Sequence, residues 1–361
     1  MLTMHPHILR RSALAVLLAF GLAGAGAAID AGSTALDPLD PLLRPAASGQ
    51  HIESSVLIGV TRAGSRLVAV GESGIVLISD DDGMGWRQAA VPVSVTLTAV
   101  MFATPEKGWA VGHSGVVLAT GDGGLTWTAQ LDGTRMATLA VEPDDQAADA
   151  PPAVPNAGDP LLDVLFLDER EGYATGAFGM FLHTTDGGAN WTRVPRRLPN
   201  PDGNHLYGIR ALGDHLYVVG ERGAVYVSQD RGATFTALTT PYEGSFFGVA
   251  GTGAGTVVVY GLQGRAFASG DHGRTWQDAG AGGAGAWTGA TVLPDGRMVL
   301  VGQAGDVQLQ TAGGGNFIAM AGKHPPLSGV AVGSNGNLVA VGPRGIHTIK
   351  LADAMTGSAT Q

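Results

Sequence analysis

A phrase with two glycines separated by two variable residues returns seven times along the chain, and it predicts an all-β fold, a seven-bladed β-propeller. Successive copies begin 41, 64, 44, 41, 41 and 40 residues apart. Glycine makes up 57 of the 361 residues, as expected for a chain with many tight turns. The first glycines of the copies are Gly71, Gly112, Gly176, Gly220, Gly261, Gly302 and Gly342.

Each repeat is expected to supply a four-stranded blade. An inner apolar strand such as residues 97–102 comes first, and a second strand such as residues 108–112 ends at the first glycine. The two variable residues then form a tight hairpin that leads into a third strand such as residues 116–120. The fourth strand begins at the aromatic residue that ends the next turn.

The turn before the fourth strand has the pattern Ser/Thr-x-Asp-x-Gly-x-Thr-aromatic, as in "TGDGGLTW" (120–127). This pattern resembles the Asp-box, or BNR, repeat of sialidase-type propellers. The Asp fixes the turn by accepting backbone N–H groups, and the aromatic ring fills the gap between blades. A calcium site is disfavoured because one turn supplies too few of the roughly 6–8 oxygens that Ca²⁺ takes. The motif residues predicted to be structural are Asp81, Asp122, Asp186, Asp230, Asp271, Trp86, Trp127, Trp191, Phe235 and Trp276.

The repeats divide the chain into a propeller at residues 51–352 and a C-terminal tail at residues 353–361. Seven units supply three strands each, but only six fourth strands are visible in the sequence. We expect the N-terminal segment, residues 29–50, to close the seventh blade with an outer strand, where proline is tolerated. The insertion at residues 135–160 is rich in Ala, Pro and Asp and is expected to be a mobile loop between the second and third blades.

Residues 1–28 have the pattern of a signal peptide: a basic pair, a short apolar run and small residues that fit a cleavage site. We therefore expect an exported protein in the periplasm of a Gram-negative bacterium, with no membrane insertion after signal removal. The formal net charge of −10 argues against nucleic acid as a partner. The absence of cysteine excludes disulfides and thiolate chemistry.

The hairpin phrases and Asp-boxes across residues 55–350 also resemble the photosystem II stability and assembly factors of chloroplasts and cyanobacteria. That resemblance implies an exported seven-bladed propeller that acts as an assembly factor without chemistry of its own. It implies a membrane or envelope protein complex as the partner, and an export system in bacteria without photosystems. We further expect a monomer.

The alternative is a sialidase-like glycoside hydrolase or a glycan-binding propeller. Sialidases need three arginines, a Tyr nucleophile helped by Glu, and an Asp acid, and their N-terminal Arg motif is absent from the first blade. The string "RRLP" (196–199) lies after the third Asp-box instead. Tyr242 and Glu243 are adjacent, but neighbours in a strand point to opposite faces. Because no nucleophile–base pair emerges from the spacing, we predict no catalytic residues.

The variable hairpin residues form a ring on the face opposite the Asp-boxes, where loops between blades also lie. Arg222 and Arg344 are the residues expected to engage carboxylates of a partner. The histidines show no metal-ligand spacing, so no metal and no cofactor are predicted. The candidate binding residues are Glu72, His113, Phe178, Glu221, Arg222, Gln263, Gln303 and Arg344.

Overall fold

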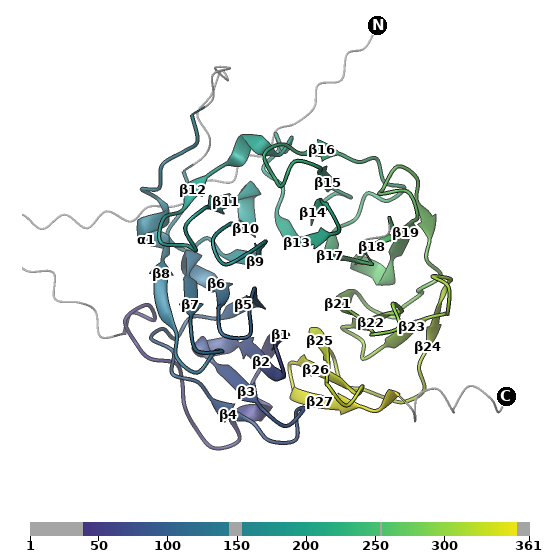
Figure 1. The fold of residues 1–361 in the computed structure, drawn as a ribbon, viewed down its shortest axis with the longest axis horizontal. Coiled ribbons are helices and arrows are strands. Elements are labelled where there is room, and N and C mark those ends of the chain that lie inside the picture. The colour runs from purple at the N-terminus through teal and green to yellow at the C-terminus, as the bar shows by residue number, and fades with distance from the viewer. Residues whose placement is uncertain (1–38, 144–153, 253–254, 352–361) are drawn as a thin grey trace, which may run out of the picture. The chain divides into compact units, whose positions relative to one another are not determined.

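The computed structural model describes residues 39–143, 154–252 and 255–351, and within them seven antiparallel sheets surround a common axis (Figure 1). Each sheet follows the chain order of its strands, and its first strand lies nearest the axis (Figure 1). This arrangement confirms the seven-bladed β-propeller. The predicted signal peptide at residues 1–28 and the tail at residues 353–361 lie outside the described residues.

The first four blades have four strands each. Blade 1 consists of β1 (Leu57–Ala63), β2 (Arg66–Gly71), β3 (Val76–Ser79) and β4 (Arg87–Gln88). Blade 2 consists of β5 (Leu97–Phe102), β6 (Gly108–Gly112), β7 (Val117–Thr120) and β8 (Thr128–Leu131). Blade 3 consists of β9 (Leu161–Phe166), β10 (Gly172–Gly176), β11 (Phe181–Thr184) and β12 (Thr192–Arg193). Blade 4 consists of β13 (Leu206–Leu212), β14 (His215–Gly220), β15 (Val225–Ser228) and β16 (Thr236–Ala237).

The last three blades complete the ring. Blade 5 consists of β17 (Phe246–Gly251), β18 (Val257–Gly261), β19 (Ala266–Ser269) and β20 (Gln277–Asp278). Blade 6 consists of β21 (Trp287–Val292), β22 (Met298–Gly302), β23 (Val307–Gln310) and β24 (Phe317–Ala319). Blade 7 consists of β25 (Gly329–Val332), β26 (Leu338–Gly342) and β27 (Gly345–Ile349).

The hydrophobic core lies between neighbouring blades. Every residue of the second strands β6, β10, β18, β22 and β26 is buried, because both faces of these strands are covered by adjacent sheets. One cluster joins Trp109 and Val111 of blade 2 to Val164 and Ala174 of blade 3. Strands buried on both faces therefore read as continuous apolar runs rather than alternating ones.

Blade 7 has three strands in the described part of the chain, and residues 39–50 do not supply a fourth. They form no strand and lie against blade 1, where the Ala46 N–H donates to the Val91 carbonyl (3.0 Å) and the Ser94 N–H donates to the Pro41 carbonyl (2.7 Å). The prolines at 41 and 45 have no N–H for a strand ladder. The predicted closing strand therefore does not hold for residues 39–50, and residues 29–38 lie outside the described residues.

The ring instead closes by packing of blade 1 on blade 7. Trp86 of blade 1 packs with Val339 of blade 7, together with Ala331. The Arg62 guanidinium donates to the Val332 carbonyl (3.2 Å). Side chains rather than a shared sheet hold the two ends together in the described residues.

The insertion is more closely packed than its composition predicts. It begins with a helical turn, α1 (Gly133–Met136), whose Met136 is fully buried between blades 2 and 3. Val141 forms a parallel bridge with Arg193 of β12, so the chain around Val141 lies beside the outer strand of blade 3. Residues 135–143 are therefore packed against the blades, and residues 144–153 lie outside the described residues, so the mobility expected of the insertion stays a prediction.

Candidate binding face

The Asp-box carboxylates hold their own turns together. Asp122 accepts hydrogen bonds from the Leu125 N–H (2.9 Å), the Thr126 N–H (3.0 Å) and the hydroxyls of Thr120 (2.8 Å) and Thr126 (2.6 Å). The Gly124 N–H donates to the Thr120 hydroxyl (3.1 Å), and Gly124 has a φ of 86°, where glycine is favoured. The same Ser/Thr–Asp hydrogen bond recurs at Asp81, Asp186, Asp230 and Asp271.

The Asp-box aromatics pack onto the preceding blade. Trp127 is 4% exposed, packs in the cluster that contains Val68 and Ile78 of blade 1, and donates its indole N–H to the Gly124 carbonyl (3.1 Å). Trp191 and Phe235 are also buried against the blade before their own. Trp86 and Trp276 are half-buried. These aromatic side chains of the Asp-boxes therefore stabilise the packing between blades.

Replacement of Asp122 by alanine should lower the free energy of unfolding by about 1–3 kcal/mol, because the turn N–H groups lose their acceptor. Chemical denaturation of the wild type and the variant measures this difference. Asp122→Asn is the control, since its amide oxygen keeps one acceptor and should retain part of the stability. Loss of a specific activity at unchanged stability would contradict the structural assignment.

Stability should also fall in acid because these carboxylates are stabilised in the folded state. Hydrogen bonds from the Thr275 N–H, the Thr275 hydroxyl and Ser269 lower the pKa of Asp271 to about 2. A folded pKa below the unfolded value of about 3.9 means that the stabilisation is present above that value and is lost as the pH falls towards about 2. We expect the Tm to drop over this window, and Asp271→Asn to drop less. Equal drops would contradict the assignment.

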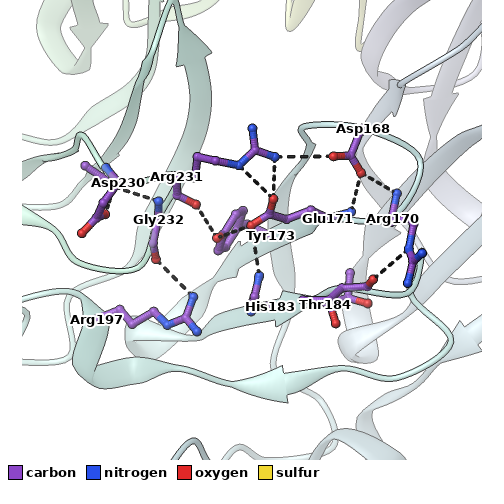
Figure 2. A network of polar contacts seen from close by, with 12 residues as sticks. Asp168, Arg170, Glu171, Tyr173, His183, Thr184, Arg197, Asp230, Arg231 and Gly232 are labelled. Atoms are coloured by element: carbon purple, nitrogen blue, oxygen red, sulfur yellow. Dashed lines mark hydrogen bonds and ion pairs between the residues drawn. The ribbon is translucent and has the colours of Figure 1, made fainter.

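A polar network joins blades 3 and 4 at the Asp-box of blade 4 (Figure 2). Arg231, in the blade 4 Asp-box, pairs with Glu171 (2.5 Å) and Asp168 (3.4 Å) in the turn between β9 and β10. Tyr173 donates its hydroxyl to the Arg231 carbonyl (2.6 Å), and Arg197 donates to the Gly232 carbonyl (3.2 Å). The network fastens two neighbouring blades.

This network contains a Tyr–Glu pair beside two arginines, which are residue types that a sialidase uses. The Tyr173 hydroxyl lies 3.5 Å from Glu171, but Tyr173 is 1% exposed and its ring stacks with those of Phe181 and His183. Burial, with the nearby Glu171 charge, raises the pKa of Tyr173 to about 12. A tyrosine that is buried and held in its protonated form is not an activated nucleophile.

The opposite face, called the hairpin face, is formed by the turns between second and third strands and by the connections between blades. In five of these turns the second variable residue has a left-handed backbone conformation, with φ from 53° to 59°. These residues are Ser73, Ser114, Phe178, Arg222 and Gln263. Phe178, Arg222 and Gln263 are exposed at these positions, and Phe178 is 60% exposed.

Only some of the predicted binding residues lie around the same hollow. Phe178, Glu221 and Arg222 line a hollow of about 510 Å³ over blades 3 to 5. Gln263 accepts the Tyr242 hydroxyl (3.4 Å) at the neighbouring turn of blade 5. The other predicted residues do not line this hollow, and they lie on the turns of blades 1, 2, 6 and 7: Glu72, His113, Gln303 and Arg344.

Both glutamates among the predicted binding residues accept a hydrogen bond from the backbone of their own blade. The Glu72 carboxylate accepts the Val56 N–H (2.9 Å), and the Glu221 carboxylate accepts the His205 N–H (2.9 Å). Each bond ties a hairpin turn to the connection that enters its own blade. Arg222 lies 3.9 Å from Asp202, so a carboxylate of this chain already faces the arginine that was expected to bind a partner.

Sequence reasoning missed the other three ionisable residues of this hollow: Asp202, His205 and Glu243. They lie on connections between blades, outside the repeated phrase, so periodicity gives no signal for them. His205 Nδ1 accepts the Phe178 N–H (3.0 Å), and the two rings form a T-shaped contact at 4.8 Å. His205 therefore holds the backbone at Phe178.

The inner strands carry an ion pair between a buried carboxylate and a half-exposed guanidinium, which the repeat pattern also did not indicate. Asp163 on β9 is 5% exposed and accepts the N–H groups of Val164 (3.0 Å) and Ile209 (2.9 Å) in addition to Arg210 on β13. The Arg210 side chain is 49% exposed within a hollow lined by the inner strands. The Asp163 charge raises the pKa of Arg210.

Metal and membrane features can be assessed in the described part of the chain. Its residues contain no group of three or more His, Cys, Asp or Glu side chains arranged to hold a metal ion. None of its helices has the length and apolar character needed to cross a membrane.

Comparison with known proteins places these features in a family. Residues 78–142 and 152–321 match the family model described as photosynthesis system II assembly factor YCF48. The photosystem II assembly lipoprotein Ycf48 of Synechococcus sp. (strain CC9902) is 28% identical over 118 residues, which are 32% of this chain and 35% of that protein. The chloroplastic photosystem II stability/assembly factor HCF136 of Oryza sativa subsp. japonica is 34% identical over 92 residues, which are 24% of this chain and 22% of that protein.

The match thus spans about a third of the first relative and about a fifth of the second. A solved structure described as YCF48 bound to D1 peptide has the same fold, with a TM-score of 0.59 and 15% identity over 81% of this chain and 92% of that one. The family model itself covers more than half of the residues, through blades 2 to 6 and their Asp-boxes. This chain therefore belongs to the YCF48 family of photosystem II assembly factors.

Proposed function

We propose that this protein is an exported, non-catalytic assembly or accessory factor that binds a segment of a membrane or envelope protein complex through its hairpin face. The observation that carries the proposal is a contrast between the two faces. The Asp-box aspartates and aromatics are used within the scaffold, whereas Phe178 on the hairpin face is 60% exposed beside a hollow. Exposed aromatic residues are frequent anchors in protein interfaces.

The family supports a protein partner, since a YCF48 structure is described as bound to a D1 peptide. The signal-peptide pattern at residues 1–28 supports export, and we propose the periplasm of a Gram-negative bacterium as the location. The partner is a photosystem complex in a photosynthetic host and an export system in other hosts. The protein is proposed to act as a monomer.

Site-specific photocrosslinking in envelope membranes tests the proposal. A photoreactive amino acid is placed at Phe178 or Arg222 on the hairpin face, and at Arg274 in the blade 5 Asp-box as the control. All three positions are exposed. We expect one membrane or envelope protein to be crosslinked from the first two positions and not from the third. Equal crosslinking from all three positions, or none from the hairpin face, would reject this binding face.

Glycosidase activity is the competing function, and it predicts turnover by the purified protein alone. We expect no hydrolysis of sialosides or other glycosides above the rate of a blank. Saturable turnover that a single carboxylate substitution on the hairpin face abolishes would overturn the non-catalytic assignment. If turnover is observed, Tyr173→Phe tests whether the network in Figure 2 takes part in it, and we expect this variant to keep the activity of the wild type.

A further inference from the structure

Two hollows lie side by side on the hairpin face and share the Phe178 ring as a wall. The first, of about 300 Å³, is mainly apolar and is lined by Val154, Pro155, Met180 and Phe181 as well as Phe178. Its lining also includes the polar residues Asn156, Asp159 and Arg193. This volume is at the lower end of the range for ligand pockets, about 300–1,000 Å³. It is sized for one large apolar side chain rather than for an extended ligand.

The second hollow has acidic walls. Asp202, Glu221 and Glu243 contribute carboxylates, and Arg222 contributes the single guanidinium. Arg222 lies 3.9 Å from Asp202, whereas no ion pair or side-chain hydrogen bond within the described residues engages Glu243. The hollow therefore carries a net negative charge, and its surplus carboxylates complement a cationic side chain.

The exposure of Phe178 is not explained by the turn that carries it. Four equivalent turns have Ser73, Ser114, Arg222 and Gln263 at the same left-handed position, so the conformation does not require an aromatic residue. The Phe178 backbone is fixed by its hydrogen bond to His205 Nδ1 (3.0 Å), and its ring contacts the His205 ring. An exposed ring with a fixed backbone is pre-organised for binding.

The insertion of this chain does not complement the acidic hollow. Residues 144–153 have the sequence DDQAADAPPA, which contains three aspartates and no Lys or Arg. Its charge has the same sign as the hollow, so this segment is not the cationic occupant.

We propose that the two hollows around Phe178 form one peptide site, which takes a large apolar side chain in the first hollow and a Lys or Arg side chain in the second. This inference rests on the proposed function and names the chemistry of the segment that is bound. The Phe178 ring separates the two side chains and contacts both. The cation gains from the aromatic face as well as from the carboxylates.

A panel of capped peptides tests this specificity on the full chain. Each peptide is acetylated, amidated and built of Gly and Ser, with one Leu and one Arg separated by one, two or three residues. We expect the Leu/Arg peptide of the best spacing to bind, and the matched Leu/Glu and Ser/Arg peptides to bind about tenfold more weakly or worse, by isothermal titration calorimetry. The charge contribution should also weaken with added salt. Equal binding of Leu/Arg and Leu/Glu peptides, or no binding by any peptide, would overturn the proposal.

Variants locate the binding on the protein. Phe178→Ala and the pair Asp202→Lys with Glu243→Lys should each weaken the Leu/Arg peptide about tenfold. Alanine at 178 adds no new strain, because phenylalanine already occupies the left-handed conformation (φ 55°). The matched controls are Glu106→Lys, an exposed acid in a turn of the Asp-box face, and Met84→Ala, which removes a side chain that is 84% exposed in the blade 1 Asp-box. Undiminished binding by Phe178→Ala, with both controls also unchanged, would overturn the site.

The two proposals fail in different ways. If hairpin-face crosslinks to an envelope protein persist while the peptides show no preference for Leu with Arg, the proposed function stands and this specificity is wrong. If the peptides bind as expected and no envelope protein is crosslinked, the site stands and the proposed function is wrong.

Discussion

Replacement of Trp127 by alanine should lower the free energy of unfolding by about 3–5 kcal/mol, the usual range for removing a buried aromatic side chain. The indole is 4% exposed and packs between blades 1 and 2 in an edge-to-face contact with Phe102 at 6.1 Å. Its removal leaves a cavity at an interface that two rigid sheets cannot fill by small movements. The Gly124 carbonyl also loses its donor.

Equilibrium denaturation in urea measures the loss, with two comparison variants. Met84→Ala removes a side chain that is 84% exposed in the blade 1 Asp-box, and its effect should stay within about 0.5 kcal/mol. Trp276→Ala removes a half-buried indole at the equivalent position of blade 5 and should fall between the other two. If Trp127→Ala were no more destabilising than Met84→Ala, the ring would not be a packing element.

Replacement of Asp163 by alanine should lower the free energy of unfolding by about 1–3 kcal/mol for each buried backbone N–H that loses its acceptor. The carboxylate is 5% exposed and holds the N–H groups of Val164 and Ile209 as well as Arg210. Without it, two buried N–H groups lose their acceptor, and Arg210 lies among inner strands without a counter-ion. Blades 3 and 4 would lose their polar link at the axis.

Thermal and chemical denaturation of two further variants separates these contributions. Asp163→Asn keeps an acceptor for one N–H and should lose less stability than alanine. Asp214→Ala removes an exposed acid from the turn between β13 and β14 and should change stability by less than about 0.5 kcal/mol. A small loss for Asp163→Ala would show that the guanidinium and the N–H groups find other partners.

The sequence predicts the propeller well because its determinants are repeated. A glycine pair or an Asp-box that returns in successive units identifies a turn, whereas a single copy would not. Trp127 and Asp122 could therefore be assigned from pattern alone. Asp163 could not, because it is one acid in an otherwise apolar strand and its partner Arg210 lies on the next blade.

The hairpin hollow was only partly predictable for the same reason. Phe178, Glu221 and Arg222 belong to the repeated phrase, so their positions on one face follow from strand order. Asp202, His205 and Glu243 lie on connections whose lengths and sequences differ between blades. Which hairpin residues gather and which stand apart depends on those connections, and the repeat carries no information about them.

The way the ring closes has a mechanical consequence. In the part of the chain that the structure describes, no strand crosses between blades 1 and 7, so their contact rests on packed rings such as Trp86 and on single hydrogen bonds such as the one from Arg62 to the Val332 carbonyl. Every sheet can stay intact while this one interface parts. The interface between blades 1 and 7 is thus where the ring can open locally. Its backbone amides should exchange with solvent before those at interfaces between blades that are consecutive in the chain.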